Sequence, residues 1–492
     1  MPILWRQSAW KRAVTFALLG AIAALGQAPQ DAWPLSILAL TAAFGLSASA
    51  ESHRQNMALW FFVGVGYFAV SLRWIIEPFL VDIARHGWMA PFAIVFMAAG
   101  FALFWGAAGW VGAKWKSSLV LVATLTLAEA TRSLILTGFP WALVGHIWID
   151  TPIAQIAAFT GPHGLNLLTF GLAASLALVL QRRWLWGSVP IAVAIAWPLL
   201  APPALEIPGE DRPIVRIVHP NIPQMEKWDP ALRARNFDRL LQLTQSETPV
   251  DLVVWPESAV TELLENAYPS FNVMSDVAGG ATVITGVQRR TRPQIYQNAF
   301  AVLGRGGEIE GIYDKQHLVP FGEYIPGGEI AARFGIRGLA PSEGGGFTAG
   351  TGDKLLNLPG LGSIRPLICY EAIFPEEVRT PGERPNLLVV ITNDAWFGTG
   401  LGPTQHLKQA QLLSIEFGLP MIRSANSGIS AVIDGYGRIT AQMGLNEVGA
   451  LQSAVPKPLN ETIYARFGDT PVLLMTALIG LFGIARCLRK NN

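Results

Sequence analysis

The sequence predicts a bundle of about eight membrane-spanning helices joined to one large α/β domain. The 492-residue chain is 51% hydrophobic and only 14% charged, whereas soluble proteins average about 25% charged residues. Apolar runs of the roughly 20 residues that a transmembrane helix needs recur through the first two hundred positions. From about Pro203 to Phe467, charged residues return and short apolar runs alternate with polar helical segments.

The apolar runs divide the chain into three parts. Seven predicted spans form an N-terminal membrane domain over residues 1–203. The α/β domain follows over 204–468, and an eighth span with a short tail occupies 469–492. The boundary between the first two spans is weak, and a re-entrant hairpin there is the alternative. The predicted spans are 12–28, 33–50, 57–76, 89–112, 117–136, 153–180, 184–202 and 470–486.

Basic residues orient this arrangement, because short cytoplasmic loops are enriched in Lys and Arg. With the N-terminus in the cytoplasm, eleven basic residues fall on the inner side and three on the outer side. The α/β domain is then extracytoplasmic, in the periplasm if the host is a Gram-negative bacterium, and both termini are cytoplasmic. The first span has basic flanks but no clear cleavage site, which predicts an uncleaved anchor. The inner residues are Arg6, Lys11, Arg12, Arg54, Lys114, Lys116, Arg182, Arg183, Arg486, Arg489 and Lys490, and the outer ones are Arg73, Arg85 and Arg132.

Charge and cysteine content exclude several classes of protein. The net charge is +1 and no basic tract resembles a nucleic-acid footprint, so we expect no nucleic-acid partner. Two cysteines cannot form a disulfide framework, and they lack the spacing of a zinc or iron–sulfur site. We therefore expect no metal and no cofactor. Nothing in the sequence demands an oligomer, so a monomer is predicted.

The α/β domain shows short apolar runs that are mostly rich in β-branched residues and have Gly, Pro or Asn nearby, the pattern of buried strands. Segments Pro230–Gln245 and Gln405–Phe417 between them have helical periodicity. The predicted strands are Val215–Val218, Asp251–Trp255, Thr282–Thr285, Ile364–Cys369, Leu387–Thr392 and Ile429–Ile433.

Cys369, Glu257 and Lys315 are the candidate catalytic residues. Cys369 closes one predicted strand, Glu257 follows another, and Lys315 lies in the polar run 313–317. Ligand sites in α/β sheets favour the carboxyl ends of strands. A carboxylate, a lysine and a thiol suggest covalent catalysis through a thioester. Glu257 could take the thiol proton, while Lys315 and the amide of Tyr370 could stabilise the oxyanion.

Each of these residues also has a simpler interpretation. A lone cysteine at a strand end is most often an inert buried residue. Glu257 could cap a helix that begins at Ser258, since acidic residues are common near helix starts. Lys315 could be a solvated loop lysine. The catalytic hypothesis therefore depends on the three residues occurring together.

The joint pattern resembles a known family. Four blocks, in order, look like the signatures of the nitrilase superfamily and, more narrowly, of the apolipoprotein N-acyltransferases, its membrane-embedded members. The resemblance implies a nitrilase-like α-β-β-α sandwich on the extracytoplasmic side of a bacterial inner membrane, after about seven helices and before one more. The blocks are Trp255–Glu257, Tyr313–Tyr324, Ile368–Glu371 and Thr392–Gly398, with Gly138–Trp141 as a match in the membrane half.

The resemblance also supplies a reaction. Members of the family take the sn-1 acyl chain of a phospholipid, commonly phosphatidylethanolamine, as a thioester on the cysteine. They pass it to the α-amino group of the diacylglyceryl-modified N-terminal cysteine of apolipoproteins, which completes lipoprotein maturation. By this resemblance Cys369 is the nucleophile, Glu257 the general base and Lys315 the electrostatic stabiliser. The matching supporting residues are Trp228, Glu323, Tyr370 and Glu371.

Other polar residues are given structural interpretations. His406 and His317 have no metal-ligand spacing, and Glu129 with Arg132 fits an ion pair at an interface better than a functional site. His163 and Asn166 could line a lipid access route. The stretch Phe321–Gly338 is either a mobile lid that dips into lipid or an ordinary surface loop.

Two other functions remain open at this point. One is a membrane-anchored nitrilase-type amidase that hydrolyses small amides with the same three residues. The other is a transporter or receptor that carries a degenerate, non-enzymatic nitrilase domain. The amidase leaves the need for eight helices unexplained, and the transporter or receptor predicts indifference to Cys369→Ser.

Overall fold

A computed structural model describes residues 3–182, 188–197, 212–293, 295–327, 346–352, 354–380 and 382–491. The chain divides into two compact units. The helical unit comprises Met1–Ile76, Ile83–Ala204 and Glu461–Asn492, and the sheet unit comprises Glu77–Asp82 and Leu205–Asn460. The short segment Glu77–Asp82, which contains helix α4 (Glu77–Leu80), groups with the sheet unit.

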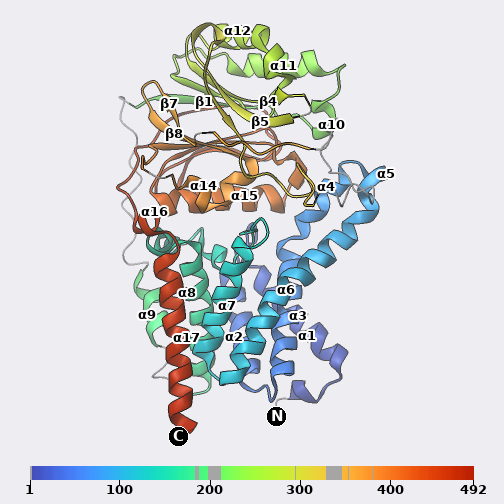
Figure 1. The fold of residues 1–492 in the computed structure, drawn as a ribbon, viewed down its shortest axis with the longest axis vertical. Coiled ribbons are helices and arrows are strands. Elements are labelled where there is room, and N and C mark those ends of the chain that lie inside the picture. Colours follow the sequence, from blue (N-terminus) through green and yellow to red (C-terminus); the bar gives the residue numbers. More distant parts are fainter. Residues whose placement is uncertain are drawn as a thin grey trace. The chain divides into compact units, whose positions relative to one another are not determined.

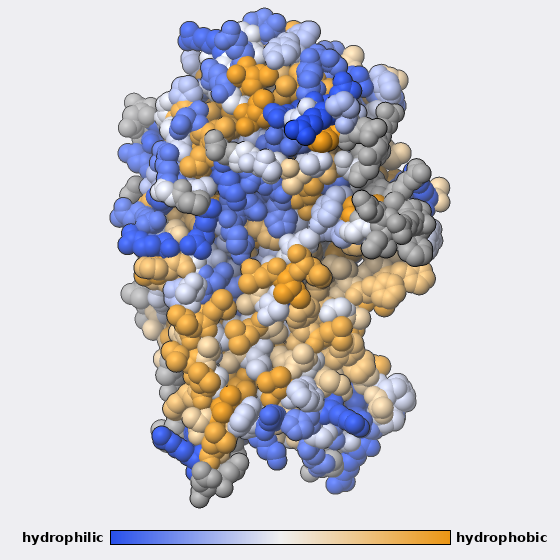
Figure 2. Space-filling model, in the orientation of Figure 1, coloured by the Kyte–Doolittle hydropathy of each residue, from blue (hydrophilic) through white to orange (hydrophobic). Residues whose placement is uncertain are grey.

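The helical unit is built from long apolar helices that run side by side (Figure 1). Its surface in Figure 2 is mostly hydrophobic, as expected of helices that face lipid. Exposed apolar side chains such as Phe96 on α6 and Leu478 on α17 contribute to that surface. The helices are α1 (Ala9–Ala24), α2 (Trp33–Ala48), α3 (His53–Ser71), α5 (Ile83–His86), α6 (Ala90–Trp115), α7 (Ser118–Leu134), α8 (Ala157–Leu180), α9 (Ser188–Ala196), α16 (Ile463–Phe467) and α17 (Thr470–Asn491).

Among the described residues, three helical segments are long and apolar enough to cross a membrane: Ile83–Trp115, Pro152–Leu180 and Thr470–Arg489. A fourth span is possible if His53–Ser71 and Arg73–Leu80, which meet at a bend of 61°, act together. Helices α1, α2 and α7 coincide with predicted spans but are shorter. A 16-residue helix is about 24 Å long at 1.5 Å per residue, against a hydrocarbon core of about 30 Å. Part of the predicted span 184–202 lies outside the described residues. Eight spans therefore remain a prediction.

The sheet unit contains two mixed sheets between two layers of helices (Figure 1). One sheet has the order β13-β1-β2-β4-β5-β6, with β3 beside β4, and the other has the order β12-β11-β10-β9-β8-β7. Helices α11 (Arg233–Thr244) and α12 (Tyr268–Val277) cover the first sheet, and α14 (Pro375–Val378) and α15 (Leu401–Phe417) cover the second. This is the predicted α-β-β-α sandwich. The first sheet is formed by β1 (Ile214–His219), β2 (Leu252–Val254), β3 (Val260–Leu263), β4 (Thr282–Arg292), β5 (Ile295–Leu303), β6 (Ile309–Asp314) and β13 (Gly449–Ala454). The second is formed by β7 (Leu356–Leu358), β8 (Gly362–Ile368), β9 (Leu387–Thr392), β10 (Met421–Ala425), β11 (Ser430–Ile433) and β12 (Ile439–Met443).

Parallel strands at the centre of each sheet position the candidate site. Strands β1, β2 and β4 run parallel in one sheet, and β8, β9 and β10 run parallel in the other. Each of the six predicted strands coincides with one of β1, β2, β4, β8, β9 and β11, and the predicted helices coincide with α11 and α15. Strands β2, β9, β10 and β11 are buried at every residue, and β8 is buried after its first residue, Gly362. Burial on both faces explains the continuous apolar runs of β2 and β9.

Candidate active site

The three predicted catalytic residues follow three different strands. Glu257 lies just beyond β2, Lys315 directly follows β6, and Cys369 directly follows β8. Their charges act on one another: Glu257 and Lys315 both shift the pKa of Cys369, and Glu257 and Cys369 both shift that of Lys315. The structure thus brings together a thiol, a carboxylate and an ammonium group that are far apart in the sequence.

Cys369 occupies a strained turn at the end of β8. Its backbone φ of +52° lies in the left-handed region, which residues other than glycine rarely adopt. Such backbone strain often marks functional sites. The predicted strand therefore ends one residue earlier, at Ile368. Only 6% of Cys369 is exposed, and burial together with the Glu257 charge raises the pKa of its thiol. The resting residue is a thiol that needs a base.

Lys315 is held as an ammonium ion by Glu323. Its Nζ lies 2.9 Å from Oε1 and 2.8 Å from Oε2 of Glu323, and only 1% of the lysine side chain is exposed. Burial alone would lower the pKa of Lys315, but the carboxylates of Glu323 and Glu257 outweigh it and the pKa lies above its ordinary value. The buried lysine therefore carries its charge at neutral pH.

Glu257 is a buried carboxylate with one strong hydrogen bond. Asn298, from β5, donates from Nδ2 to Glu257 Oε1 at 2.7 Å and to Glu323 Oε1 at 3.3 Å. Burial raises the pKa of Glu257, although Lys315 opposes the shift. A carboxylate with a raised pKa is a stronger base, so Glu257 is suited to accept the thiol proton.

Glu371 ties the Cys369 turn to the Lys315 segment. Its Oε2 accepts a hydrogen bond from the amide of Ile368 at 2.8 Å. Its Oε1 accepts from the Tyr313 hydroxyl at 2.8 Å and from the amides of Gln316 and His317 at 2.7 and 3.1 Å. One fully buried carboxylate therefore fixes the backbone on both sides of the site.

Tyr370 lies in a buried aromatic group beside the nucleophile. Its ring meets His317 edge-on at 5.5 Å and Phe374 at 4.9 Å, and His317 stacks on Phe374 at 3.8 Å. His317 also approaches Glu377 at 3.4 Å. Both contacts fit the structural interpretation of His317.

The segment that carries Trp228 contacts the candidate site through Lys227, the residue that precedes Trp228. Helix α10 (Gln224–Lys227) ends at Trp228, which is half-buried. Lys227 is buried and donates from Nζ to the backbone carbonyl of Glu257 at 2.7 Å. At the other end of the helix, Gln224 accepts a hydrogen bond from Asn393 at 2.7 Å. The sequence interpretation singled out Trp228 and missed Lys227, whose pKa burial lowers to about 8.

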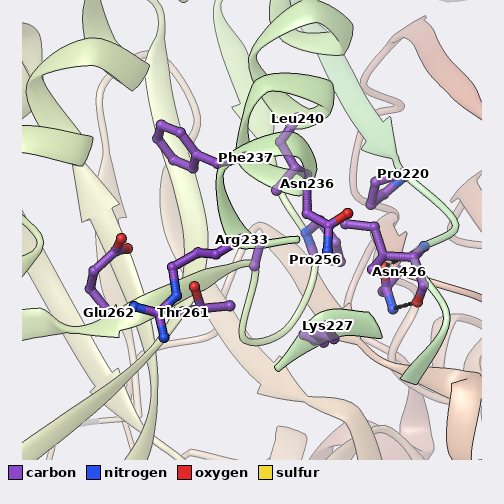
Figure 3. A pocket seen from close by; sticks show the side chains of 12 residues that line it. Pro220, Lys227, Arg233, Asn236, Phe237, Leu240, Pro256, Thr261, Glu262 and Asn426 are labelled. Carbon is purple, nitrogen blue, oxygen red and sulfur yellow. Dashed lines mark hydrogen bonds between the residues drawn. The ribbon is translucent and has the colours of Figure 1, made fainter. Parts of the chain in front are cut away.

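A small recess lies beside α11, whose residues Arg233, Asn236, Phe237 and Leu240 line it (Figure 3). Lys227 lies at one side of it, with Arg233 and Glu262 on the opposite side of the view. Its enclosed space of about 20 Å³ has room for about one water molecule. None of the three predicted catalytic side chains lines it, so it is a neighbour of the site and not the reaction cavity.

The remaining predicted residues have structural contacts. In the helical unit, Arg132 and Glu129 form a fully buried ion pair of 2.8 Å, as predicted. Asn166 accepts from the amide of Gly145 at 2.7 Å and contacts His163 at 3.2 Å. The lipid access route remains untested. The predicted Phe321–Gly338 lid lies mostly outside the described residues, and within the described ranges no group of three His, Cys, Asp or Glu residues is suited to a metal ion.

Asn298 and Asp394 are buried polar residues whose roles only the structure shows. Asn298 follows Gln297 in β5, 41 positions from Glu257. Asp394 is fully buried and lies against His406 and Arg423. The available sequence signal for Asn298 was a pair of polar residues, Gln297 and Asn298, ahead of the apolar run 299–303. That signal does not identify the partner of Asn298.

A thiol at a strained strand end, a buried carboxylate and a buried ammonium group, carried on an α-β-β-α sandwich, fit the carbon–nitrogen hydrolase class. The carbon–nitrogen hydrolase model matches residues 215–464, and the apolipoprotein N-acyltransferase N-terminal domain model matches residues 19–175. The chain belongs to the apolipoprotein N-acyltransferase family.

Relatives of that name match nearly the whole chain. The apolipoprotein N-acyltransferase of Rhodopseudomonas palustris is 36% identical over 97% of this chain and 95% of its own length. That of Bradyrhizobium diazoefficiens is 35% identical over 98% and 96%. Among solved structures, an amidase of the nitrilase superfamily from Nesterenkonia AN1 has a TM-score of 0.38 and 17% identity over 54% of this chain and 97% of that one. That structural similarity is too low to add to the assignment.

Proposed function

We propose that this protein is an acyltransferase that moves a fatty acyl chain from a phospholipid to the N-terminal diacylglyceryl-cysteine of apolipoproteins. Its family membership supports the reaction. The structural observation that carries the mechanism is a buried network of hydrogen bonds. Asn298 donates to both Glu257 and Glu323, and Lys315 donates to Glu323. Glu371 joins the Cys369 turn to the segment of Lys315. Each group required for thioester chemistry is present.

The first half-reaction forms the acyl-enzyme. Glu257 takes the proton from Cys369 as Sγ attacks the sn-1 ester carbonyl carbon, and the carbonyl oxygen becomes an oxyanion. Lys315 stabilises that negative charge. The intermediate collapses by breaking the bond between the carbonyl carbon and the glycerol oxygen. Glu257 returns the proton to that oxygen, so a lysophospholipid leaves and a thioester remains.

The second half-reaction transfers the chain to an amine. The neutral α-amino group attacks the thioester carbonyl, Glu257 accepts one proton from the nitrogen, and Lys315 again stabilises the oxyanion. The C–S bond breaks, an amide forms, and the thiolate recovers the proton. This two-step scheme predicts ping-pong kinetics. Burial of the site favours the scheme, because water would otherwise hydrolyse the thioester.

The proposal includes a location. Both substrates are anchored in a membrane, and the excess of basic residues in one set of predicted loops supports a sheet unit on the periplasmic side of the inner membrane. Eight spans, cytoplasmic termini, phosphatidylethanolamine as the preferred donor and a monomeric enzyme belong to the same proposal.

Mass spectrometry of the intact purified protein tests the chemistry. After exposure to phosphatidylethanolamine, the wild type should gain one fatty acyl mass on the peptide that contains Cys369. Cys369→Ala should gain none, and Glu257→Gln and Lys315→Met should accumulate the adduct far more slowly. A diacylated lipopeptide should then remove the adduct and become acylated. Release of ammonia from small amides, without an acyl adduct, would favour the amidase instead.

A further inference from the structure

Cys369 is held by a buried polar cluster that the proposed acyl transfer does not itself use. We define the cluster by its four residues: Thr392, Asp394, His406 and Arg423. Thr392 ends β9, Arg423 lies in β10, His406 lies in α15, and Asp394 begins the turn after β9. None of the four is measurably exposed. Their strands are the two that continue the parallel set from β8.

The cluster contacts Cys369 at both its backbone and its side chain. His406 Nε2 lies 3.2 Å from the Cys369 carbonyl oxygen, and the Thr392 side chain hydrogen-bonds the thiol. A carbonyl oxygen only accepts hydrogen bonds, so Nε2 carries a proton and donates it whatever the charge of the ring. The turn residue with φ of +52° is thereby fixed on two sides.

Thr392 and His406, the two residues that contact Cys369, both contact the carboxylate of Asp394. Asp394 Oδ1 accepts from the Thr392 hydroxyl at 2.8 Å and lies 2.9 Å from His406 Nδ1. Its Oδ2 accepts from Arg423 at 2.6 Å. Burial would raise the pKa of Asp394, but Arg423 and His406 outweigh it and the pKa lies below its ordinary value. An ionised Asp394 is therefore the fixed point of the cluster.

The surroundings leave Asp394 no freedom to move. Arg423 is anchored by donating from Nε to the carbonyl of Ile429 at 3.2 Å. Gly428 packs so closely that a Cβ there would lie 2.5 Å from Asp394 Oδ2, and its φ of +135° also disfavours a side chain. A cluster this rigid can maintain a strained turn whose own backbone preference opposes it.

We propose that His406, whose Nδ1 is held between Asp394 and Arg423, is a positioning residue for acyl transfer: it fixes the Cys369 carbonyl and so sets the direction of the thiol. The inference rests on the proposed function only in taking Cys369 as the nucleophile. Without the His406 hydrogen bond, the turn at Cys369 can relax toward negative φ and carry Sγ away from Glu257 and Lys315. The effect acts on the rate of the covalent step and leaves the affinity for phospholipid unchanged.

Two variants of His406 separate positioning from simple packing. His406→Leu removes the donor, whereas His406→Gln keeps an N–H that can reach the Cys369 carbonyl. We expect His406→Leu to lower the rate of acyl-enzyme formation about tenfold or more, the effect of one buried hydrogen bond, with an unchanged KM for phosphatidylethanolamine. His406→Gln should restore most of that rate.

Alkylation by iodoacetamide gives a readout that needs no physiological substrate. Peptide mass spectrometry reports Cys369 and Cys487 separately, so Cys487 is an internal reference in every sample. Cys369 should react more slowly in His406→Leu, recover in His406→Gln, and keep its wild-type rate in His219→Leu. His219 is a suitable control because it is also fully buried and hydrogen-bonded, to Ser430 at 2.7 Å.

The outcomes decide the proposal in each case. Equal alkylation and acylation rates in the wild type and His406→Leu would overturn it, as would a loss that glutamine does not restore. If His406→Leu does not fold, Thr392→Val decides: slower alkylation of Cys369 alone supports the cluster, and an unchanged rate overturns it. If alkylation follows these expectations but the wild type forms no acyl adduct, the proposed function fails and the positioning role stands.

Discussion

Glu323→Gln removes the charge that holds Lys315 while keeping the size of the side chain and an oxygen that can accept a hydrogen bond. In the wild type both oxygens of Glu323 lie within 3 Å of Lys315 Nζ, at 2.9 and 2.8 Å. Hydrogen bonds to charged groups contribute about 1.5–3 kcal/mol, against about 0.5–1.5 kcal/mol for neutral ones. The variant therefore loses roughly 1–1.5 kcal/mol of support for the ammonium group. Glu257 remains as its second carboxylate.

Because each 1.36 kcal/mol corresponds to about a tenfold change in rate, we expect acyl-enzyme formation to slow by roughly tenfold. The raised pKa of Lys315 depends on Glu323 more than on any other charge, so it should fall in the variant. The alkaline limit of activity should then move to lower pH. Stability follows the same sign: a raised lysine pKa contributes stability that is lost as pH rises through it. In the variant this contribution is smaller, and its loss is complete at a lower pH.

The assay is a quenched time course of acyl-enzyme formation by intact-protein mass spectrometry, repeated from neutral to alkaline pH. The matched control is Glu461→Gln, which breaks a largely exposed ion pair with Arg466. Exposed pairs contribute little, so this variant should behave as the wild type. A Glu323→Gln enzyme with the rate and pH profile of the wild type would refute the role assigned to the Lys315–Glu323 pair.

Three further predictions follow from other contacts. Asn298→Leu removes the hydrogen bond that lowers the pKa of Glu257, so the acidic limit of the acylation rate should move to higher pH. Lys227→Met removes a buried ammonium group that donates to the backbone carbonyl of Glu257, so the rate at neutral pH should fall. Arg132→Leu leaves Glu129 buried without its ion-pair partner, which should lower the free energy of unfolding by about 3–5 kcal/mol. A lower midpoint of thermal unfolding in detergent would measure this loss. The double variant Glu129→Gln with Arg132→Met should lose less stability.

The strands at the buried centres of the two sheets could be predicted from the sequence, whereas the partly buried strands β12 and β13 could not. Strand β9 is buried on both faces and its sequence, Leu387–Thr392, is a continuous run of apolar and β-branched residues. Strands β12 and β13 are only partly buried along their length, and sequences such as Ile439–Met443 mix polar and apolar residues without a clear period. Their place in the sheets depends on pairing with β11 and β1, which no local pattern contains.

The candidate site shows the same division between local and distant information. Glu257 and Cys369 could be found because each follows an apolar run, and strand ends are where reactive side chains are exposed on a rigid base. Asn298 and His406 could not be assigned partners, because their contacts join positions 41 and 37 residues apart. The candidate reactive residues can be recognised because each follows a predicted strand. The residues that hold them in place can be recognised only from contacts that the fold creates between distant segments.

The charges of the buried site explain why these supporting residues are needed. Two carboxylates, Glu257 and Glu323, face two ammonium groups, Lys315 and Lys227. Transfer of the thiol proton from Cys369 to Glu257 moves negative charge from the carboxylate to the sulfur without changing the total. The reaction therefore requires no new net charge in a region that water cannot solvate. It does require that the sulfur and later the oxyanion form close to Lys315, because attraction in a low dielectric weakens with distance. The energetic advantage of the site depends on where Sγ points, and the turn at Cys369 determines that direction.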